Sequence, residues 1–278
     1  MSPDVLADLS QAMARGETVA LVTIVEARGS TPQRVGARMV VHADGRIVGT
    51  IGGGCYESDA FGKAREAIRT RTAQLVRYDL TDDFAADTGL ICGGQMQVFI
   101  EPIDPAPSLY IVGAGHVGHQ LGRLAPALGF RVHVVDDREK FANRERFPEA
   151  ASIAVEDIPS WITQADLPES AMVVVLTRGH RQDYDAVRAL AGRPLRYVGL
   201  IGSRAKVAKL VERALEEGLP PDWLRTLHAP IGLDIGAVTP EEIAVSILAE
   251  LIAVRRGKIA EPAVRALSMA WTAPPLRG

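Results

Sequence analysis

The feature that most constrains the fold is a glycine pattern in the second half of the chain, with glycines at positions 113, 115 and 118. It directly follows the apolar stretch 109–112, which reads as a buried strand, and it opens a helical pattern over residues 117–128. In that context Gly113 permits a tight turn, Gly115 lets a phosphate approach the backbone, and Gly118 lets helix and strand pack closely. The pattern predicts a Rossmann-like strand–loop–helix unit.

Short apolar strands alternate with helices along the rest of this half, which predicts a doubly wound parallel sheet. The final helix is expected to begin at a capping box formed by Thr239 and Glu242 and to end at Gly257. We expect the remaining strands at 131–135, 153–155, 172–177 and 197–201, with helices at 183–191 and 205–217.

A nucleotide site is the first functional hypothesis for this unit. Asp136 follows the second strand about 20 residues after the glycines, where a carboxylate accepts hydrogen bonds from ribose hydroxyls. Arg138 beside it would instead favour a phosphate. His116, at the opening of the helix, is a candidate acid or base, although packing is the commoner role for such a histidine. The alternative is a Rossmann scaffold whose site is degenerate or reused for another phosphate ester.

Two prolines within the segment Asp104–Ser108 cannot continue a helix or an inner strand, so we place a domain boundary there. The expected domains are residues 1–104 and 105–278. The first reads as mixed α+β with a largely antiparallel sheet, because residues 38–50 form a hairpin pattern around Asp44 and Gly45. The fold class is therefore α/β, a mixed α+β domain followed by a Rossmann-like domain.

The first domain contains the most unusual local sequence of the chain, the triplet Gly52, Gly53 and Gly54 followed by Cys55. Consecutive glycines let backbone N–H groups converge into an anion-binding nest. A cysteine at the start of the expected helix has its thiolate favoured by the helix dipole, so Cys55 is a candidate metal ligand, nucleophile or sulfur carrier. The alternative is a sharp turn followed by a small buried cysteine. Glu57 is either a neighbouring base or a stabiliser of the first helical turn.

Two further segments carry candidate groups. Cys92 precedes two glycines and the strand 95–103, so it either shares a pocket with Cys55 or packs in the interior. The loop 28–38 combines hydroxyls and glycines with arginines. Arg34 and Arg38 are candidates for a phosphate or oxyanion through bidentate guanidinium bonds, and the alternative is a solvated turn.

Composition excludes several classes of function. A net charge of −3 and a pI near 6.1 give no global field for nucleic acid or an anionic membrane. The longest apolar run, 171–176, is too short to span a bilayer, and Asp4 and Asp8 occupy the place of a signal peptide's positive charges, so we expect a cytoplasmic protein. Two cysteines make neither a disulfide framework nor a paired zinc site.

Taken together, these motifs resemble the XdhC/CoxI family, the accessory proteins of xanthine dehydrogenase and related molybdenum hydroxylases. The matching segments keep their order over about residues 10 to 256. They are 29–32 with 36–39, 49–57, 92–94, 112–118 with 135–138, 199–204, and 228–236 running into 239–244.

The resemblance implies a chaperone for molybdenum cofactor rather than an enzyme. Such a protein binds the metal-pterin, protects it while a cysteine desulfurase supplies the sulfido ligand, and delivers it to the apo-hydroxylase. It would place Cys55 near the metal or sulfur, the triplet 52–54 as the nest, Arg34 or Arg38 on the anionic end, and Cys92 as a weaker partner. Longer relatives carry a fused nucleotidyltransferase domain that this sequence lacks, so we do not expect cytidylylation.

Two alternatives remain open from the residues. One is an NAD(P)-dependent oxidoreductase, suggested by the loop 113–118 with Asp136. The other is an interaction scaffold with vestigial sites. A dehydrogenase needs a proton donor in its substrate domain, and the first domain offers few, so binding is favoured over hydride transfer. We expect a homodimer, the commonest symmetric state.

Overall fold

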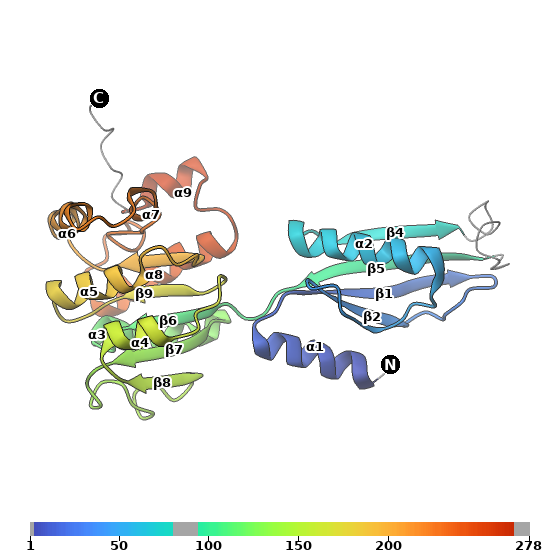
Figure 1. Cartoon of the computed structure of the whole chain (residues 1–278), viewed down its shortest axis with the longest axis horizontal. Helices are drawn as coiled ribbons and strands as arrows, with labels where there is room; N and C mark the ends of the chain where they lie inside the picture. The colour runs from blue at the N-terminus through green and yellow to red at the C-terminus, as the bar shows by residue number, and fades with distance from the viewer. Residues whose placement is uncertain (1–2, 80–93, 270–278) are drawn as a thin grey trace. The chain divides into compact units, whose positions relative to one another are not determined.

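The computed structural model describes residues 3–79 and 94–269. The chain divides into two units, Met1–Ala106 and Pro107–Gly278, so the division falls inside the proline-containing segment 104–108. Each unit has its own sheet and its own core (Figure 1). Within the described ranges, no helix is long and apolar enough to cross a membrane.

The N-terminal unit contains a five-stranded sheet in the order β3-β2-β1-β5-β4, in which all neighbours are antiparallel. This confirms the expected antiparallel character and the hairpin, whose strands β2 and β3 pair Met39 with Gly49. The elements are α1 (Pro3–Arg15), β1 (Val19–Arg28), β2 (Arg38–His42), β3 (Ile47–Gly49), α2 (Gly54–Thr70), β4 (Gln74–Asp79) and β5 (Gln95–Ile103).

The two helices cover opposite faces of this sheet (Figure 1). Alternate residues of a strand point to opposite faces, so Val22 and Ile24 of β1 pack in the cluster that contains the buried alanines of α2. Val19 and Leu21 pack with Val5 of α1 instead. The small side chains at positions 60, 64 and 67 form the apolar stripe of α2, which begins at Gly54, the last glycine of the triplet.

The C-terminal unit contains a five-stranded parallel sheet in the order β10-β9-β6-β7-β8. Counted from β6 as the first strand, this is the strand order of the classic dinucleotide-binding fold. The elements are β6 (Ser108–Val112), α3 (His116–Leu124), β7 (Arg131–Asp136), β8 (Ser152–Val155), α4 (Ile158–Gln164), β9 (Met172–Val175), α5 (His180–Leu190), β10 (Tyr197–Leu200), α6 (Arg204–Glu216), α7 (Pro221–Leu224), α8 (Pro240–Arg255) and α9 (Pro262–Leu267).

Helices cover both faces of the parallel sheet, and its strands are accordingly apolar on both sides. Helices α3 and α8 pack on one face, and α4, α5 and α6 pack on the other. The predicted capping box at Thr239 and Glu242 is present, and Gly257 follows the end of α8 with a left-handed φ of 67°. The segment 228–231 runs parallel to β10 through a bridge between Gly199 and His228.

Candidate functional site

The glycine triplet of the N-terminal unit forms an amide nest. Gly52, Gly53 and Gly54 have φ values of 123°, 76° and 81°, a run that side chains with a Cβ rarely adopt. The N–H groups of Ile51, Gly52 and Gly53 converge at one point, one residue earlier in the chain than the expected nest 52–54. The converging amides therefore belong to residues 51–53, and ligand binding by residues 52–54 stays a prediction.

An intramolecular carboxylate occupies this nest. Oε2 of Glu57 accepts hydrogen bonds from the amides of Ile51 (2.8 Å), Gly52 (3.2 Å) and Gly53 (3.0 Å), and from Oγ1 of Thr50 (2.5 Å). Burial raises the pKa of Glu57, but these hydrogen bonds outweigh it and lower the pKa. Glu57 thus stabilises the start of α2, one of the two roles expected of it, and does so by filling the anion position of the nest.

Cys55 lies in the first turn of α2, two residues before Glu57, and its thiol is free. Its side chain is half-buried, so it does not belong to a dry apolar interior. Among the described residues, no group of three or more His, Cys, Asp or Glu side chains could hold a metal ion.

Close packing brings the three motifs of this unit together. A Cβ on Gly52 would lie 2.8 Å from Cβ of Pro32, and a Cβ on Gly94 would lie 2.6 Å from the carbonyl oxygens of Arg28 and Ser30. The loop that follows β1 therefore contacts both the glycine triplet and the glycine that precedes β5. Cys92 lies outside the described residues.

The two arginines proposed for an anion differ in position. Arg34 is exposed in the turn between β1 and β2, where its carbonyl accepts the amide of Ala37. Arg38 is half-buried at the start of β2, and its carbonyl accepts the amide of Thr50, the residue that begins the nest segment (3.2 Å). Through its backbone, Arg38 is thus directly attached to the nest.

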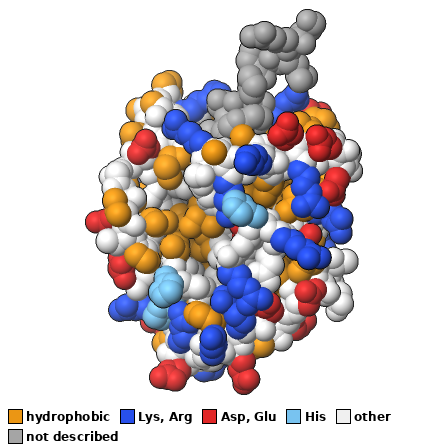
Figure 2. All heavy atoms as spheres, turned by 90° about the vertical axis from the view of Figure 1, so that its left-hand side faces the viewer, with side chains coloured by type: hydrophobic (Ala, Val, Ile, Leu, Met, Phe, Trp, Pro, Cys, Tyr) orange, Lys and Arg blue, Asp and Glu red, His pale blue; other side chains and the backbone are white. Residues whose placement is uncertain are grey.

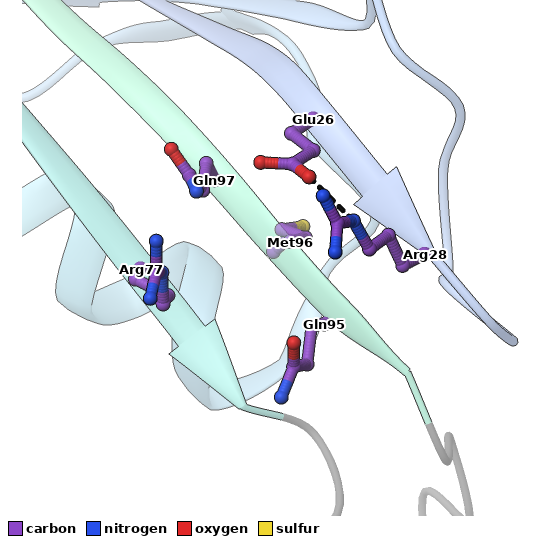
Figure 3. A pocket seen from close by; sticks show the side chains of 6 residues that line it. All are labelled: Glu26, Arg28, Arg77, Gln95, Met96 and Gln97. Atoms are coloured by element: carbon purple, nitrogen blue, oxygen red, sulfur yellow. Dashed lines mark ion pairs between the residues drawn. The ribbon is translucent and has the colours of Figure 1, made fainter.

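A shallow pocket of about 90 Å³ lies on the sheet next to Gly94 (Figure 3). Arg28 from β1 forms an ion pair with Glu26 there (2.6 Å), while Arg77 projects from β4 and Gln97 from β5. Glu26 compensates the charge of Arg28, so Arg77 supplies the one net positive charge of the pocket lining. The sequence analysis did not predict this pocket.

The glycine loop of the C-terminal unit has the expected geometry. Gly113 has φ of 111°, and a Cβ there would lie 2.4 Å from the carbonyl oxygen of Leu176, next to β9. A Cβ on Gly118 would lie 2.2 Å from the carbonyl oxygen of Gly113. Around Gly115, by contrast, no atom lies within 4 Å of such a Cβ, so the backbone is open to a ligand there.

Asp136 is engaged differently from the expectation of a ribose-binding carboxylate. Its side chain is buried, and it accepts hydrogen bonds from the amide of Ala114 (2.8 Å) and from Nε and Nη2 of Arg138 (2.8 and 2.9 Å). Burial raises the pKa of Asp136, and the bonds from Arg138 and Ala114 lower it overall. The carboxylate ties the loop after β6 to the loop after β7, which weakens the case for NAD(P) binding.

Basic side chains gather at the carboxyl edge of the parallel sheet, the face that Figure 2 presents. His116 follows β6, Arg178 and His180 follow β9, and Arg204 follows β10, and all four are exposed. Asp234 is also exposed, and its amide donates to the carbonyl of Leu267 (2.6 Å). Arg178 is paired with Asp137 (2.8 Å), so the positive charge that this edge offers an anion comes mainly from Arg204.

Two buried carboxylates that the sequence analysis missed hold segments of the C-terminal unit in place. Asp183 accepts from Oγ1 of Thr177 (2.5 Å) and Nζ of Lys206 (2.6 Å). Glu250 accepts from Tyr197 and Gly232 and bonds to His228. The sequence does contain a sign of the buried Glu250, because this charged residue falls on the apolar stripe of its helix, beside Ile247 and Leu251.

The strand order and the glycine loop define a Rossmann-type protein, here joined to an antiparallel domain with a thiol beside an amide nest. Comparison with protein families finds the XdhC Rossmann domain over residues 109–251 and the XdhC and CoxI family over residues 12–79. The chain belongs to the XdhC and CoxI family.

Known relatives agree with this assignment. The chain is 37% identical over 237 residues to the uncharacterized protein YqeB of Escherichia coli K12, and the match covers 85% of this chain but 43% of YqeB. The chain therefore spans less than half the length of that relative. It is 23% identical over 295 residues to the molybdenum cofactor insertion chaperone PaoD of Escherichia coli K12, covering 88% of this chain and 86% of PaoD.

A solved structure supports the same relationship. The crystal structure of a protein described as a xanthine dehydrogenase from Bacillus halodurans matches with a TM-score of 0.51 and 25% sequence identity. The match covers 93% of this chain and 98% of that chain. The likeness thus extends over both units.

Proposed function

We propose that this protein binds molybdenum cofactor, protects it while a cysteine desulfurase supplies the sulfido ligand, and delivers it to an apo-hydroxylase of the xanthine dehydrogenase type. The observation that carries the proposal is the amide nest at residues 51–53, followed two residues later in the chain by the half-buried free thiol of Cys55. Similarity to a molybdenum cofactor insertion chaperone supports the same cargo.

The residues fit the chemistry of this cargo. Molybdenum cofactor carries a phosphate and an oxo-metal centre held by a dithiolene. A protein that binds it therefore needs hydrogen-bond donors for the phosphate and can offer a soft ligand such as a thiolate to the metal. The nest already holds an oxyanion, the carboxylate of Glu57, which shows that its donors suit a negatively charged oxygen. Because the cofactor brings its own sulfur ligands, the absence of a metal-binding cluster among the described residues is compatible with it.

Each site residue then has a proposed role. The amides of residues 51–53 bind the anionic end, with Arg34 or Arg38 supplying a cation. Cys55 lies near the metal or the incoming sulfur, and Cys92 is a weaker second thiol. The loop of Gly113, Gly115, His116 and Gly118 is a secondary phosphate site in the other unit.

The test is a titration of released molybdenum cofactor onto the full chain, followed by transfer to an apo-hydroxylase. We expect Cys55→Ser to weaken retention about tenfold, the effect of losing one contact of about 1.4 kcal/mol, and to lower hydroxylase activation. Ser58→Ala is the matched control, because Ser58 is an exposed residue of the same helical turn. Equal retention and activation by wild type and Cys55→Ser would contradict the proposal.

A further inference from the structure

The carboxylate of Glu57 stands where the proposed function requires the anion of the ligand. A single oxygen, Oε2, receives three amides and one hydroxyl at 2.5 to 3.2 Å. Convergent N–H donors of this kind characterise sites for phosphate and other oxyanions. The same donors cannot serve Glu57 and a ligand at once, so one must displace the other.

We propose that Glu57 is a built-in competitor, an intramolecular anion that closes the nest until the anionic group of the ligand displaces it. The identity of the natural ligand rests on the proposed function, whereas Glu57 would compete with any phosphate-like oxyanion for the nest. Glu57 thereby lowers the affinity of the nest for the ligand and raises the ligand concentration that is needed to fill it.

Glu57 is placed so that it can leave. Its side chain is half-exposed in the first turn of α2, so rotation about its side-chain bonds returns the carboxylate to water, which solvates it well. Its four donors in the nest are neutral groups. Asp136 offers the contrast, because it is buried and Arg138 holds it with two charge-assisted bonds.

Part of the nest is held without the carboxylate. Its left-handed φ values are accessible to glycine without strain, and Pro32 packs against Gly52. The amide of Gly52 also bonds to Oγ1 of Thr50 (2.9 Å), so part of the turn is closed without Glu57. An emptied nest should therefore keep its donors in place for a ligand.

The size of the effect follows from the open fraction of the nest. The apparent dissociation constant equals the intrinsic one divided by the fraction of molecules in which the site is open. If Glu57 occupies the nest in about nine-tenths of molecules or more, removing the competition tightens binding at least about tenfold. A purely structural cap predicts the opposite sign, because losing a charged acceptor would loosen the turn and weaken binding.

The experiment titrates inorganic phosphate onto the full-length protein and follows the amide NMR signals of Gly52 and Gly53. We expect Glu57→Gln to bind phosphate at least about tenfold more tightly than wild type, since the substitution keeps the shape and removes the competing charge. Asp59→Asn is the control, because it removes an equal charge two residues further on, where the carboxylate bonds to Lys63 and Tyr78 instead of the nest.

Equal or weaker phosphate binding by Glu57→Gln, or the same gain in Asp59→Asn, would overturn the proposal. Glu57→Ala, checked by thermal melting, repeats the measurement with the nest emptied and guards against an effect peculiar to glutamine. Retention of molybdenum cofactor by wild type is measured separately. If wild type retains molybdenum cofactor while Glu57→Gln binds phosphate no more tightly than wild type, only the competitor role of Glu57 is wrong. If wild type does not retain molybdenum cofactor, the proposed cargo is wrong, and the phosphate result still tests the competition.

Discussion

Replacing Glu250 with leucine should destabilise the C-terminal unit severely. The Glu250 side chain is buried and accepts the hydroxyl of Tyr197 (2.7 Å) and the amide of Gly232 (2.6 Å), and it pairs with Nδ1 of His228 (2.9 Å). Leucine fills similar space but leaves these three donors without their acceptor, at about 1–3 kcal/mol each. Because such losses are not fully additive, we expect the free energy of unfolding to fall by about 3–5 kcal/mol.

Urea denaturation followed by tryptophan fluorescence reports on the unfolding of the C-terminal unit, because that unit contains all three tryptophans, Trp161, Trp223 and Trp271. Glu212→Leu, on the exposed face of α6, serves as the control and should change stability by less than about 0.5 kcal/mol. A loss below about 1 kcal/mol in Glu250→Leu would refute the view that this carboxylate holds the loop.

The carboxylate of Glu250 also predicts a pH dependence. Burial raises its pKa, but the bonds from His228, Tyr197 and Gly232 lower it overall, below the ordinary value of 4.5. A carboxyl group with a lowered pKa in the folded state stabilises the protein above pH 4.5, and this contribution disappears as the pH falls through the lowered pKa. Acid unfolding of the C-terminal unit should therefore be less steep in Glu250→Leu than in wild type.

Two further predictions concern the other packed positions. Gly113→Ala should lower the stability of the C-terminal unit by about 2–3 kcal/mol in the same urea assay, because its Cβ would lie 2.4 Å from the carbonyl oxygen of Leu176. Gly115→Ala is the control and should leave the stability nearly unchanged. Equal losses of stability in the two variants would contradict the glycine-loop geometry. Asp8→Asn should weaken the N-terminal unit by about 1–3 kcal/mol, because Asp8 accepts from His42 and Arg46. Burial raises the pKa of Asp8 and these bonds lower it overall, so its contribution is present above pH 3.8 and lost as the pH falls further. Amide protection factors in α1, corrected for the intrinsic exchange rate, that are the same at pH 7 and pH 3 would argue against it.

The fold was largely predictable from local sequence signals. The glycines at 113 and 118 could be interpreted because a strand precedes them and a helix follows, and the sheet of this unit is parallel, as expected. The hairpin around Gly45 and the capping box at Thr239 were predicted for the same reason, since both depend on neighbouring residues.

The candidate site was less predictable, because its chemistry depends on which polar groups satisfy one another across longer distances. The glycine triplet indicated an amide nest, but no local pattern showed that Glu57 would fill it. Asp136 matches the ribose-binding position in sequence, yet Arg138 and Ala114 take its oxygens. The contact of Pro32 with Gly52 arises from the loop after β1, whose course the sequence alone did not define.

The central claim is that the N-terminal turn and its thiol hold a metal-pterin anion. Its most direct measurement is the molybdenum that co-elutes with the full-length protein after incubation with released cofactor and gel filtration, quantified by elemental mass spectrometry. We expect about one molybdenum per chain for wild type, lowered by excess inorganic phosphate, which competes for the amides of residues 51–53. Absence of molybdenum from the protein fraction, or retention that neither phosphate nor Cys55→Ser reduces, would contradict this account.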